Sequence, residues 1–453
     1  MLAAGAADRE WKHRMPDEDC NVPAPRATRD WLAALAADLA ARKRDHLWRR
    51  LPVVQSAQGP VLEIDGRTYL QFCTNNYLGL AADAEVIDAA RSALDRWGVG
   101  AGASRLVAGS LAAHQELEQA LAEFKGSEAA LLFPSGYTAN LAVLSTFAGA
   151  ADRIISDKLN HASLLDAARL SGAAHRVFPH RNYKKAGMFL QRPPHAGRAA
   201  PGTRRTAVPA ATVLERRSPF SPTAASGRNF LVTDTVFSMD GDLADLTDLC
   251  ALGRRGQALV IIDEAHATGV LGPEGRGVAA MQRVEAEIAL SVGTLSKALG
   301  SVGGFVCGSA VAIEALVNRA RGFIYTTAPP AACSSAALAA LRIMRREPAR
   351  RRRVMDLAQR VRSTLESLGY RCGNSQSPIL PVILGSAQAA LQAAEWLRAR
   401  GIFVPAIRPP SVAPRSARLR LSLMATHSDS HIEELLAAFG RMRDQDFLTE
   451  LDR

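Results

Sequence analysis

Two apolar runs near the middle of the chain end in residues that could do chemistry. The run 260–262 is followed at once by Asp263, and His266 comes three residues later. A second run, 288–292, leads into Gly-Thr-Leu-Ser and then Lys297. Runs of this kind are typical of buried strands, and ligands bind beside the carboxyl ends of the strands in an open α/β sheet. We therefore expect Asp263, His266 and Lys297 to meet at one edge of a sheet.

The residue types at this edge favour Schiff-base chemistry at Lys297. The surrounding segment is rich in glycine and nearly free of other charge, and a desolvated amine has a lowered pKa and becomes nucleophilic. A nearby carboxylate such as Asp263 is what a pyridoxal phosphate site needs to keep the pyridine nitrogen protonated. The competing interpretation is an ordinary surface lysine, which is the usual location of this residue type.

The letters IIDEAH at 261–266 also occur in the acidic box of some nucleic-acid helicases. That function requires a G-x-x-x-x-G-K-[ST] phosphate loop, and neither Gly-Lys-Ser nor Gly-Lys-Thr occurs in the chain. We therefore expect no nucleic-acid partner. A nucleotide-dependent enzyme stays open as an alternative that nucleotide binding would reveal.

Short apolar runs alternate with helical patterns through the middle of the chain. The runs lie at 129–133, 153–156, 230–234, 258–263, 288–293 and 303–308. Strands that alternate with helices predict a mostly parallel central sheet with helices on both faces, so we expect the α/β fold class.

The pattern changes after about residue 330, where we expect a small α+β domain. The expected helices lie at 331–345, 352–368, 387–400 and 431–442, and the expected strands at 379–384, 402–407 and 417–423. Near the N-terminus we expect a helix over about 31–50 and a hairpin around Asp65-Gly66.

These patterns divide the chain into four parts. We expect a disordered tail, an N-terminal helix and hairpin segment, a large cofactor-binding domain and a small C-terminal domain, at 1–28, 29–75, 76–330 and 331–445. Residues 183–227 are rich in Pro, Arg, Ala and Ser and show little periodicity. Because this stretch is longer than a compact domain usually places between two strands, we interpret most of it as a flexible surface insertion.

The composition is typical of a soluble globular enzyme, with 48% hydrophobic and 22% charged residues among 453. No apolar stretch approaches the roughly 20 residues of a membrane span, so we expect no membrane partner. The N-terminus lacks the apolar core of a secretory signal, and Met15 is a second candidate start. The six cysteines form no C-x-x-C pair, which favours a cytoplasmic location.

The net charge of +11 comes mainly from arginine. A compositional bias toward Arg and Ala is the simple explanation. The functional alternative is attraction of an acidic partner, such as a phosphorylated thioester carrier.

Three further motifs could contribute to the same site. FPSGYTAN places Gly136 and Tyr137 between a strand and a helix N-terminus, where backbone N–H groups can hold a phosphate. His161 lies just inside a predicted helix and could lie over a flat ring, although a capping or core histidine is the commoner case. Ser238 follows a strand and could donate a hydrogen bond to an aromatic oxygen.

Seven motifs in this order resemble those of the α-oxoamine synthases, which are fold-type-I pyridoxal-phosphate enzymes that condense an amino acid with an acyl thioester. The motifs are NNYLGL (75–80), GASRLVAGS (102–110), FPSGY (133–137), NHASLLDA (160–167), VFSMDGD (236–242), DEAHATGVLGPEGRG (263–277) and GTLSKALG (293–300). Each motif is weak alone, but the set is highly specific and the likeness extends over about 30–445. The resemblance implies an aspartate-aminotransferase-like fold, and only the stretch 183–227 departs from the family pattern.

The resemblance implies catalytic roles for three of these residues. Lys297 would hold pyridoxal 5'-phosphate as a Schiff base and, once freed, remove the Cα proton of the amino acid. Asp263 would pair with the pyridinium nitrogen, and His161 would stack on the ring. His266 and Ser238 would contact the phenolic oxygen.

The resemblance also implies how phosphate and substrates are held. Gly136, Tyr137 and Thr294 would hold the phosphate, helped by Thr327 of a second subunit, because these enzymes build their sites at a homodimer interface. The amino acid carboxylate would be bound by Asn75 and Arg420, since a guanidinium suits a bidentate contact. The acyl substrate would meet Arg408, Ser411 and Arg49, although Arg50 is an equally placed alternative to Arg49.

The C-terminal segment AIRPPSVAPRSARLRLSLMATHS (406–428) resembles the family member that acts in biotin biosynthesis. That resemblance implies condensation of L-alanine with a pimeloyl thioester, carried on coenzyme A or on an acyl carrier protein. Another member, such as a glycine C-acetyltransferase, stays open. So does a relative that binds the cofactor and a partner without catalysis.

Overall fold

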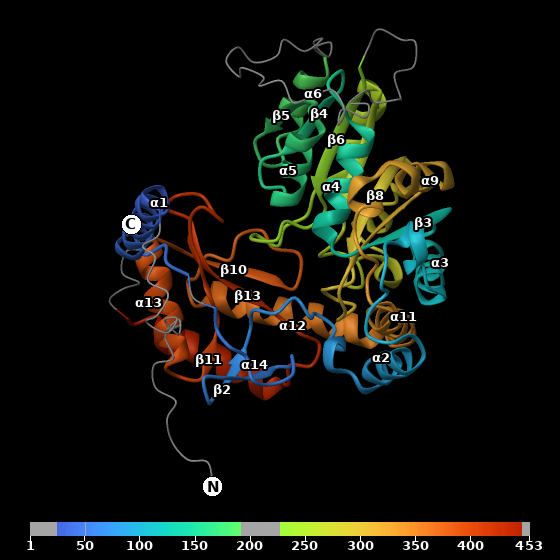
Figure 1. The fold of residues 1–453 in the computed structure, drawn as a ribbon. Helices are drawn as coiled ribbons and strands as arrows, with labels where there is room; N and C mark the ends of the chain where they lie inside the picture. The colour runs from blue at the N-terminus through green and yellow to red at the C-terminus, as the bar shows by residue number, and fades with distance from the viewer. Residues whose placement is uncertain (1–24, 50, 192–226, 446–453) are drawn as a thin grey trace.

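The structure is a computed structural model, and it describes residues 25–49, 51–191 and 227–445 (Figure 1). Its centre is a seven-stranded sheet in the order β3-β9-β8-β7-β6-β4-β5. The strands are β3 (Ala129–Phe133), β4 (Arg153–Asp157), β5 (Ala174–Phe178), β6 (Asn229–Asp234), β7 (Ala258–Asp263), β8 (Ile288–Thr294) and β9 (Gly304–Gly308). β9 runs antiparallel to both of its neighbours, β3 and β8, and the other four pairings of this sheet are parallel. The predicted α/β class with a mostly parallel sheet is confirmed.

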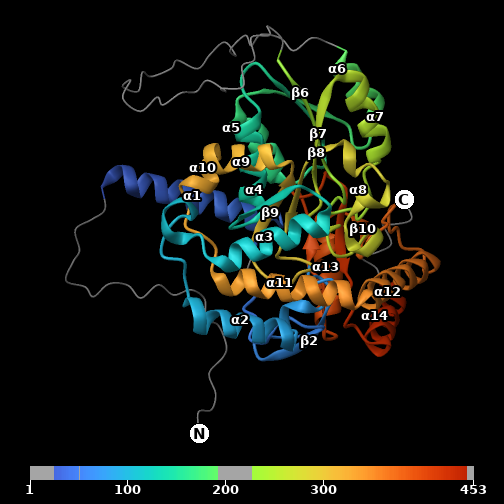
Figure 2. The same ribbon diagram turned by 90° about the vertical axis from the view of Figure 1, so that its right-hand side faces the viewer.

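Both faces of this sheet are buried, because successive residues of a strand enter different cores. Val260 and Ile262 belong to one apolar cluster, and Ile261 between them belongs to another. Figure 2 shows α4 (Gly136–Phe147) and α5 (Ala162–Ser171) on one side of the sheet and α7 (Leu246–Gly256) on the other. A strand that is buried on both faces has a continuous run of apolar residues, and for this reason these strands could be predicted from the sequence.

Other helices of the chain up to residue 346 are α2 (Ala84–Trp97), α3 (Ala112–Lys125), α8 (Val278–Met281), α9 (Ala310–Arg319), α10 (Arg321–Ile324) and α11 (Ala331–Arg346). α3 and α9 contact β3 and β9, α10 contacts α4, and α11 packs against α2 and α3. In the described part of the chain, none of the helices combines the length and the hydropathy of a bilayer crossing.

A second, antiparallel sheet with the order β10-β13-β12 lies in the C-terminal part. It is formed by β10 (Ile379–Gly385), β12 (Ala406–Ile407) and β13 (Ala417–Ser422), and α12 (Pro348–Ser367), α13 (Ala387–Arg398) and α14 (Asp429–Met442) accompany it. The predicted helices of this region are confirmed to within a few residues. The predicted strand over 402–407 is wrong as one element, because β11 (Ile402–Phe403) and β12 join different sheets. Pro405, which has no N–H for a ladder, lies between them.

The N-terminal hairpin is confirmed, and a distant segment extends it. Strands β1 (Val61–Ile64) and β2 (Arg67–Gln71) pair antiparallel around Asp65 and Gly66, which both have positive φ, as a two-residue hairpin turn requires. β11 then pairs parallel with β2, so the N- and C-terminal parts share one small sheet.

The helix before the hairpin, α1 (Arg26–Arg44), begins and ends earlier than expected. None of its residues is buried, and Trp31 and Leu32 are exposed.

The expected insertion at 183–227 is wrong for its first residues, which form helix α6 (Tyr183–Leu190). Asn182 caps this helix by accepting a 2.9 Å hydrogen bond from Lys185 N. Ala186 is fully buried, and the Tyr183 hydroxyl accepts a 2.8 Å hydrogen bond from Asp245 N. Packing against α7 therefore outweighs the weak local periodicity. Residues 192–226 lie outside the described residues.

Candidate active site

Asp263 ends β7 with its carboxylate held by two donors. Asn140 Nδ2 lies 2.6 Å from Asp263 Oδ2, and the backbone N–H of Ala265 donates to Oδ1 at 2.8 Å. The Asn140 amide also donates to Ser163 Oγ at 2.9 Å, so three segments meet at this carboxylate. Asp263 is only 6% exposed. The carboxylate therefore has a fixed orientation at the carboxyl edge of the sheet.

A second carboxylate, Asp234, lies directly opposite Asp263 in the β6–β7 register. It accepts a 2.6 Å hydrogen bond from His161 N. Burial raises the pKa of Asp234 well above its usual range, and the charge of Asp263 adds to this effect. The direction of this shift has a simple cause, because two carboxylates that share a buried site cannot easily both ionise.

Lys297 lies in the turn after β8 and is half-buried. Burial lowers the pKa of its amine, while the charges of Asp263 and Asp234 oppose this and that of Arg420 adds to it. Among the described residues, the amine of Lys297 interacts with these groups through charge alone, without a side-chain hydrogen bond. A desolvated amine without a fixed partner is available as a nucleophile or base.

The turn that follows Lys297 needs glycine. Gly300 has a φ of 62°, and an added Cβ would come within 2.4 Å of Ala81 N. Glycine is therefore required at position 300, because the backbone there passes close to a neighbouring segment in a conformation that L side chains rarely adopt.

The two histidines of the site are held in the neutral form. The Nδ1 of His266 lies 2.7 Å from the Tyr77 hydroxyl. Burial lowers the pKa of His266 well below its usual value, and the charges of Lys297 and Arg420 lower it further. Burial likewise lowers the pKa of His161, which caps α5 and lies 2.7 Å from Ser163 Oγ. Each neutral ring offers one donor and one acceptor.

Arg420 on β13 connects the small sheet to this edge. Its Nε donates to the Ser238 carbonyl at 2.5 Å, and its terminal nitrogens donate to Asn75 Oδ1 at 3.2 Å and Ser422 Oγ at 2.8 Å. The Tyr77 hydroxyl is 3.2 Å from the same Asn75 oxygen. The guanidinium is buried, so a cation at a fixed position faces the amine and the imidazole whose pKa values it lowers.

The expected phosphate residues also lie close together. An added Cβ on Gly136 would be 3.4 Å from Thr294 Cβ, and Thr294 Oγ1 lies 2.7 Å from Ser296 Oγ. Gly136 is the first residue of α4, so hydroxyls and free backbone N–H groups share one helix N-terminus. The Tyr137 ring meets His161 edge-on at 6.4 Å, and its hydroxyl donates to Asp166 at 2.6 Å.

Thr327 is not brought to this edge within one chain. It is exposed and forms an isolated bridge with Ser104. Its expected phosphate contact therefore stays a prediction that needs a second subunit.

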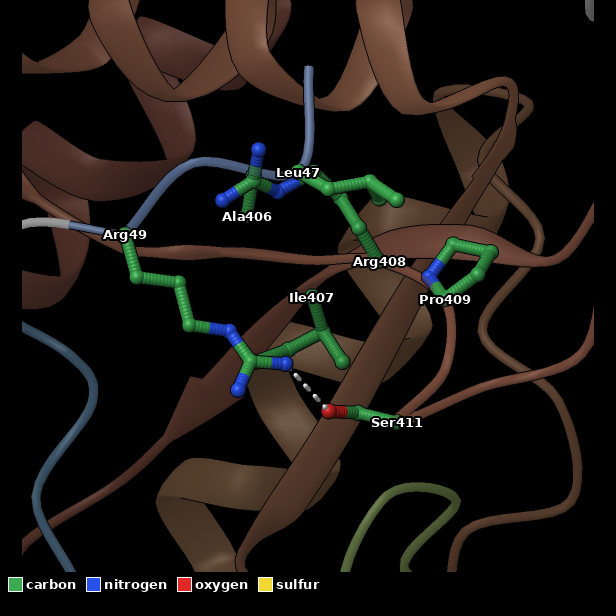
Figure 3. Close-up of a pocket in the computed structure, with 7 residues that line it drawn as sticks. All are labelled: Leu47, Arg49, Ala406, Ile407, Arg408, Pro409 and Ser411. Atoms are coloured by element: carbon green, nitrogen blue, oxygen red, sulfur yellow. Dashed lines mark hydrogen bonds between the residues drawn. The ribbon is translucent and has the colours of Figure 1, made fainter. Parts of the chain in front are cut away.

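The residues expected for the acyl substrate line a separate cavity of about 100 Å³ (Figure 3). Arg49 points toward Ser411, with 3.4 Å between its terminal nitrogen and the Ser411 hydroxyl. Arg408 instead donates to the backbone carbonyls of His46 and Trp48, the latter at 3.2 Å. Arg408 thus braces the segment that carries Arg49, which is its simpler structural role. Arg50 lies outside the described residues.

Three residues of this edge were not singled out from the sequence, although signals for them existed. Asp234 ends a predicted strand in the same way as Asp263. Asn140 lies one helical turn after Gly136, within the quoted FPSGYTAN. Tyr77 lies within NNYLGL. Their partners come from distant segments, so the sequence did not show what they contact.

The side chains at this edge fit pyridoxal 5'-phosphate. Asn140 Oδ1 is buried and has no hydrogen-bond partner among the described residues, which leaves an acceptor beside the Asp263 carboxylate. The donor set combines a low-pKa amine, a buried carboxylate and a helix N-terminus with hydroxyls. These are the groups that an aromatic cofactor with a ring nitrogen, an aldehyde and a phosphate requires.

Comparisons with known proteins show the family to which the chain belongs. The family model for aminotransferases of class I and II matches residues 67–439. An 8-amino-7-oxononanoate synthase of Pseudomonas paraeruginosa is 42% identical over 422 residues, which cover 92% of this chain and 97% of the relative. One from Stutzerimonas stutzeri is 44% identical over 407 residues, covering 90% and 96%.

A solved structure is similar over nearly the same extent. Serine palmitoyltransferase from S. paucimobilis, solved with a PLP–myriocin aldimine bound, superposes with a TM-score of 0.80 at 29% identity. The match covers 91% of this chain and 97% of that one. The chain therefore belongs to the aminotransferase class I and II family of pyridoxal-phosphate enzymes and, within it, to the α-oxoamine synthases.

Proposed function

We propose that the chain is an 8-amino-7-oxononanoate synthase, which condenses L-alanine with a pimeloyl thioester, releases the thiol carrier and CO2, and acts in biotin biosynthesis. The observation that supports this most is the Lys297 amine in the turn after β8, which interacts with the charges of Asp263 and the buried Arg420 and whose pKa burial lowers. The identity of about 42% to synthases of this name supports the choice of reaction.

When bound, pyridoxal phosphate supplies an electron sink for the bond that breaks at the amino acid Cα. Lys297 would hold the cofactor covalently, and its freed Nζ would take the Cα proton. Because burial lowers the pKa of this amine, a larger share of it is an unprotonated base near neutral pH.

Asp263 would keep the ring nitrogen protonated. Asn140 Nδ2 and the Ala265 N–H hold its oxygens in place, so the carboxylate would not need to reorganise during the reaction. His161 would lie over the ring, and Ser238 and neutral His266 would contact the phenolic oxygen. Gly136, Tyr137 and Thr294 would bind the phosphate.

Asn75 and Arg420 would bind the carboxylate of L-alanine. The guanidinium is positioned by the Ser238 carbonyl and by Ser422, and it carries more N–H donors than its protein contacts use. Arg49 and Ser411 would meet the remote polar end of the pimeloyl chain, and Arg408 would hold Arg49 in place as well as shape that end of the cavity.

We also propose a cytoplasmic homodimer in which Thr327 of one subunit reaches the phosphate of the other. The exposed apolar residues of α1 support burial against another chain. The acyl carrier would be coenzyme A or an acyl carrier protein. The division into a tail, an N-terminal segment and two domains, with boundaries near residues 75 and 330, stays a proposal.

The test is direct turnover by the purified holoenzyme. Incubation with L-alanine and pimeloyl-CoA or pimeloyl-acyl carrier protein should yield 8-amino-7-oxononanoate by mass spectrometry, and L-alanine alone should change the cofactor absorption. Acetyl, succinyl and palmitoyl thioesters should react more slowly. Faster turnover of glycine with acetyl-CoA would replace this proposal by the glycine C-acetyltransferase alternative.

A further inference from the structure

One histidine outside the site, His180, joins two segments that carry proposed site residues. It follows β5, and its Nδ1 lies 3.0 Å from Asp157 Oδ1 while its Nε2 lies 2.8 Å from Asp242 Oδ2. Both carboxylates are almost fully buried. We call these three residues the His180 bridge.

The first carboxylate of the bridge belongs to the turn that leads to His161. Asp157 ends β4 and accepts a 2.8 Å hydrogen bond from Leu159 N within that turn. Its other oxygen accepts from Arg181 N at 2.8 Å. Asp157 therefore ties the turn before His161 to the backbone beside His180.

The second carboxylate belongs to the loop that carries Ser238. The Asp242 carbonyl accepts from Phe237 N at 3.0 Å, and the Phe237 carbonyl accepts from Gly241 N at 2.7 Å. The His180 ring also packs edge-on against Phe237, with centroids 4.4 Å apart. Since the next residue, Ser238, gives its carbonyl to Arg420, the position of this loop also sets the position of that guanidinium.

The two contacts of His180 require a protonated ring. A neutral imidazole donates from one nitrogen only, whereas both nitrogens of His180 face buried carboxylates. Burial alone would lower the pKa of His180, but the hydrogen bonds and charges of Asp157 and Asp242 outweigh it and raise the pKa to about 9.

Other charged and titratable groups surround the bridge. Arg181 lies 3.6 Å from Asp242, and Tyr183, whose pKa burial raises to about 12, is neutral and close to Asp157. Asp234 also interacts with Asp157, and burial raises the pKa of Asp234 well above its usual range. Among the three residues of the bridge, His180 is the group whose pKa is raised to about 9.

We propose that His180 is a positioning residue of the reaction: as an imidazolium it fixes the turn before His161 and the loop of Ser238 relative to each other, and through that loop it orients Arg420. This inference rests on the proposed function. Because the pKa of His180 in the folded protein is raised, the stabilisation is fully present below the ordinary histidine pKa and is lost as the pH rises through about 9.

The test compares the wild-type holoenzyme with His180→Gln, which keeps a donor but not the charge. We expect normal cofactor content and a kcat/KM for L-alanine lower by about tenfold to 10²-fold at neutral pH, since small misplacements of binding groups cost this much. The ratio of wild-type to variant kcat/KM should fall toward one as the pH passes 9. The apparent Kd for L-alanine, from the absorption change, should follow the same course.

His175→Gln is the matched control. His175 lies on β5, is half-buried and hydrogen-bonds Ser156 Oγ at 2.7 Å without a carboxylate, so its kcat/KM should stay near wild type. Adding Asp242→Asn to His180→Gln should lower kcat/KM little further than His180→Gln alone does. Both substitutions disrupt the same interaction, the contact between His180 and Asp242.

Three outcomes decide the matter. A wild-type-to-variant ratio that is the same at every pH, or equal activity of the two proteins, would overturn the positioning role. If His180→Gln is too unstable to assay, Asp242→Asn replaces it and should show the same pH-dependent ratio. If the wild type shows no turnover but its unfolding midpoint exceeds that of His180→Gln only below pH 9, the proposed function fails and the His180 bridge stands.

Discussion

The side-chain amide of Asn140 and the carboxylate of Asp263 are joined by a 2.6 Å hydrogen bond, although 123 residues separate them in the sequence. The pair connects the helix that begins at the proposed phosphate site to the carboxylate proposed for the ring nitrogen. A hydrogen bond to a charged group that is buried contributes about 1.5–3 kcal/mol, so Asn140 is a substantial part of what fixes Asp263.

Removal of the charge at Asp263 should abolish most of the activity without loss of the fold. Asp263→Asn keeps the shape and still binds the cofactor, but the rate should fall by several orders of magnitude, about the cost of a misdirected proton partner in other sites. Steady-state kinetics and cofactor absorption measure this. Asn140→Ala should lower kcat by about tenfold to 10²-fold, and it should have almost no further effect in an Asp263→Asn background. Near-normal activity of Asp263→Asn would contradict the assignment.

Lys297→Ala should eliminate turnover and the covalent cofactor adduct. After borohydride reduction, peptide mapping of the wild type should place the cofactor on the peptide that contains Lys297, and the variant should carry none. Lys184→Ala, which removes an exposed lysine of α6, is the control and should be labelled like the wild type. A reducible adduct in Lys297→Ala would show that another lysine holds the cofactor.

Arg49 and Arg408 should both affect KM for the acyl substrate but differ in their effect on stability, because Arg408 donates to the backbone carbonyls of His46 and Trp48. Arg49→Ala should raise KM for the pimeloyl thioester by about tenfold and leave the unfolding temperature and the alanine-induced absorption change intact. Arg408→Ala should raise the same KM and also lower the unfolding temperature. Arg44→Ala, at the end of α1, is the control for loss of one surface charge. An unchanged KM in Arg49→Ala would remove Arg49 from the acyl site.

Shortening the chain between Gln191 and Gly227 should preserve both the fold and the activity. A short Gly/Ser linker in place of residues 192–226 changes loop closure by only about 0.6 kcal/mol per doubling of length. Thermal unfolding and turnover of the purified variant measure the effect. A deletion of 183–226 should lower the unfolding temperature clearly, because it also removes α6 and the Tyr183 contact to Asp245. Insoluble or inactive protein from the shorter deletion would show that these residues are structural.

The sequence alone predicted those features of the fold and the site that depend on local residue patterns. Asp263 and Lys297 could be placed at a sheet edge because their strands are buried on both faces and read as apolar runs that stop abruptly at polar residues. The Asp65-Gly66 turn could also be predicted from the sequence, because few residue pairs adopt its backbone conformation.

Only the tertiary structure decided which distant groups meet. Tyr77 reaches His266 and Asn140 reaches Asp263 because strand order and close packing bring remote segments together, and no local pattern encodes that choice. The same cause made α6 a helix despite its weak periodicity, split 402–407 between two sheets, and turned Arg408 toward the backbone of His46 and Trp48. Periodicity tells which face of an element is buried, whereas the partner on that face is set by the packing of the whole chain.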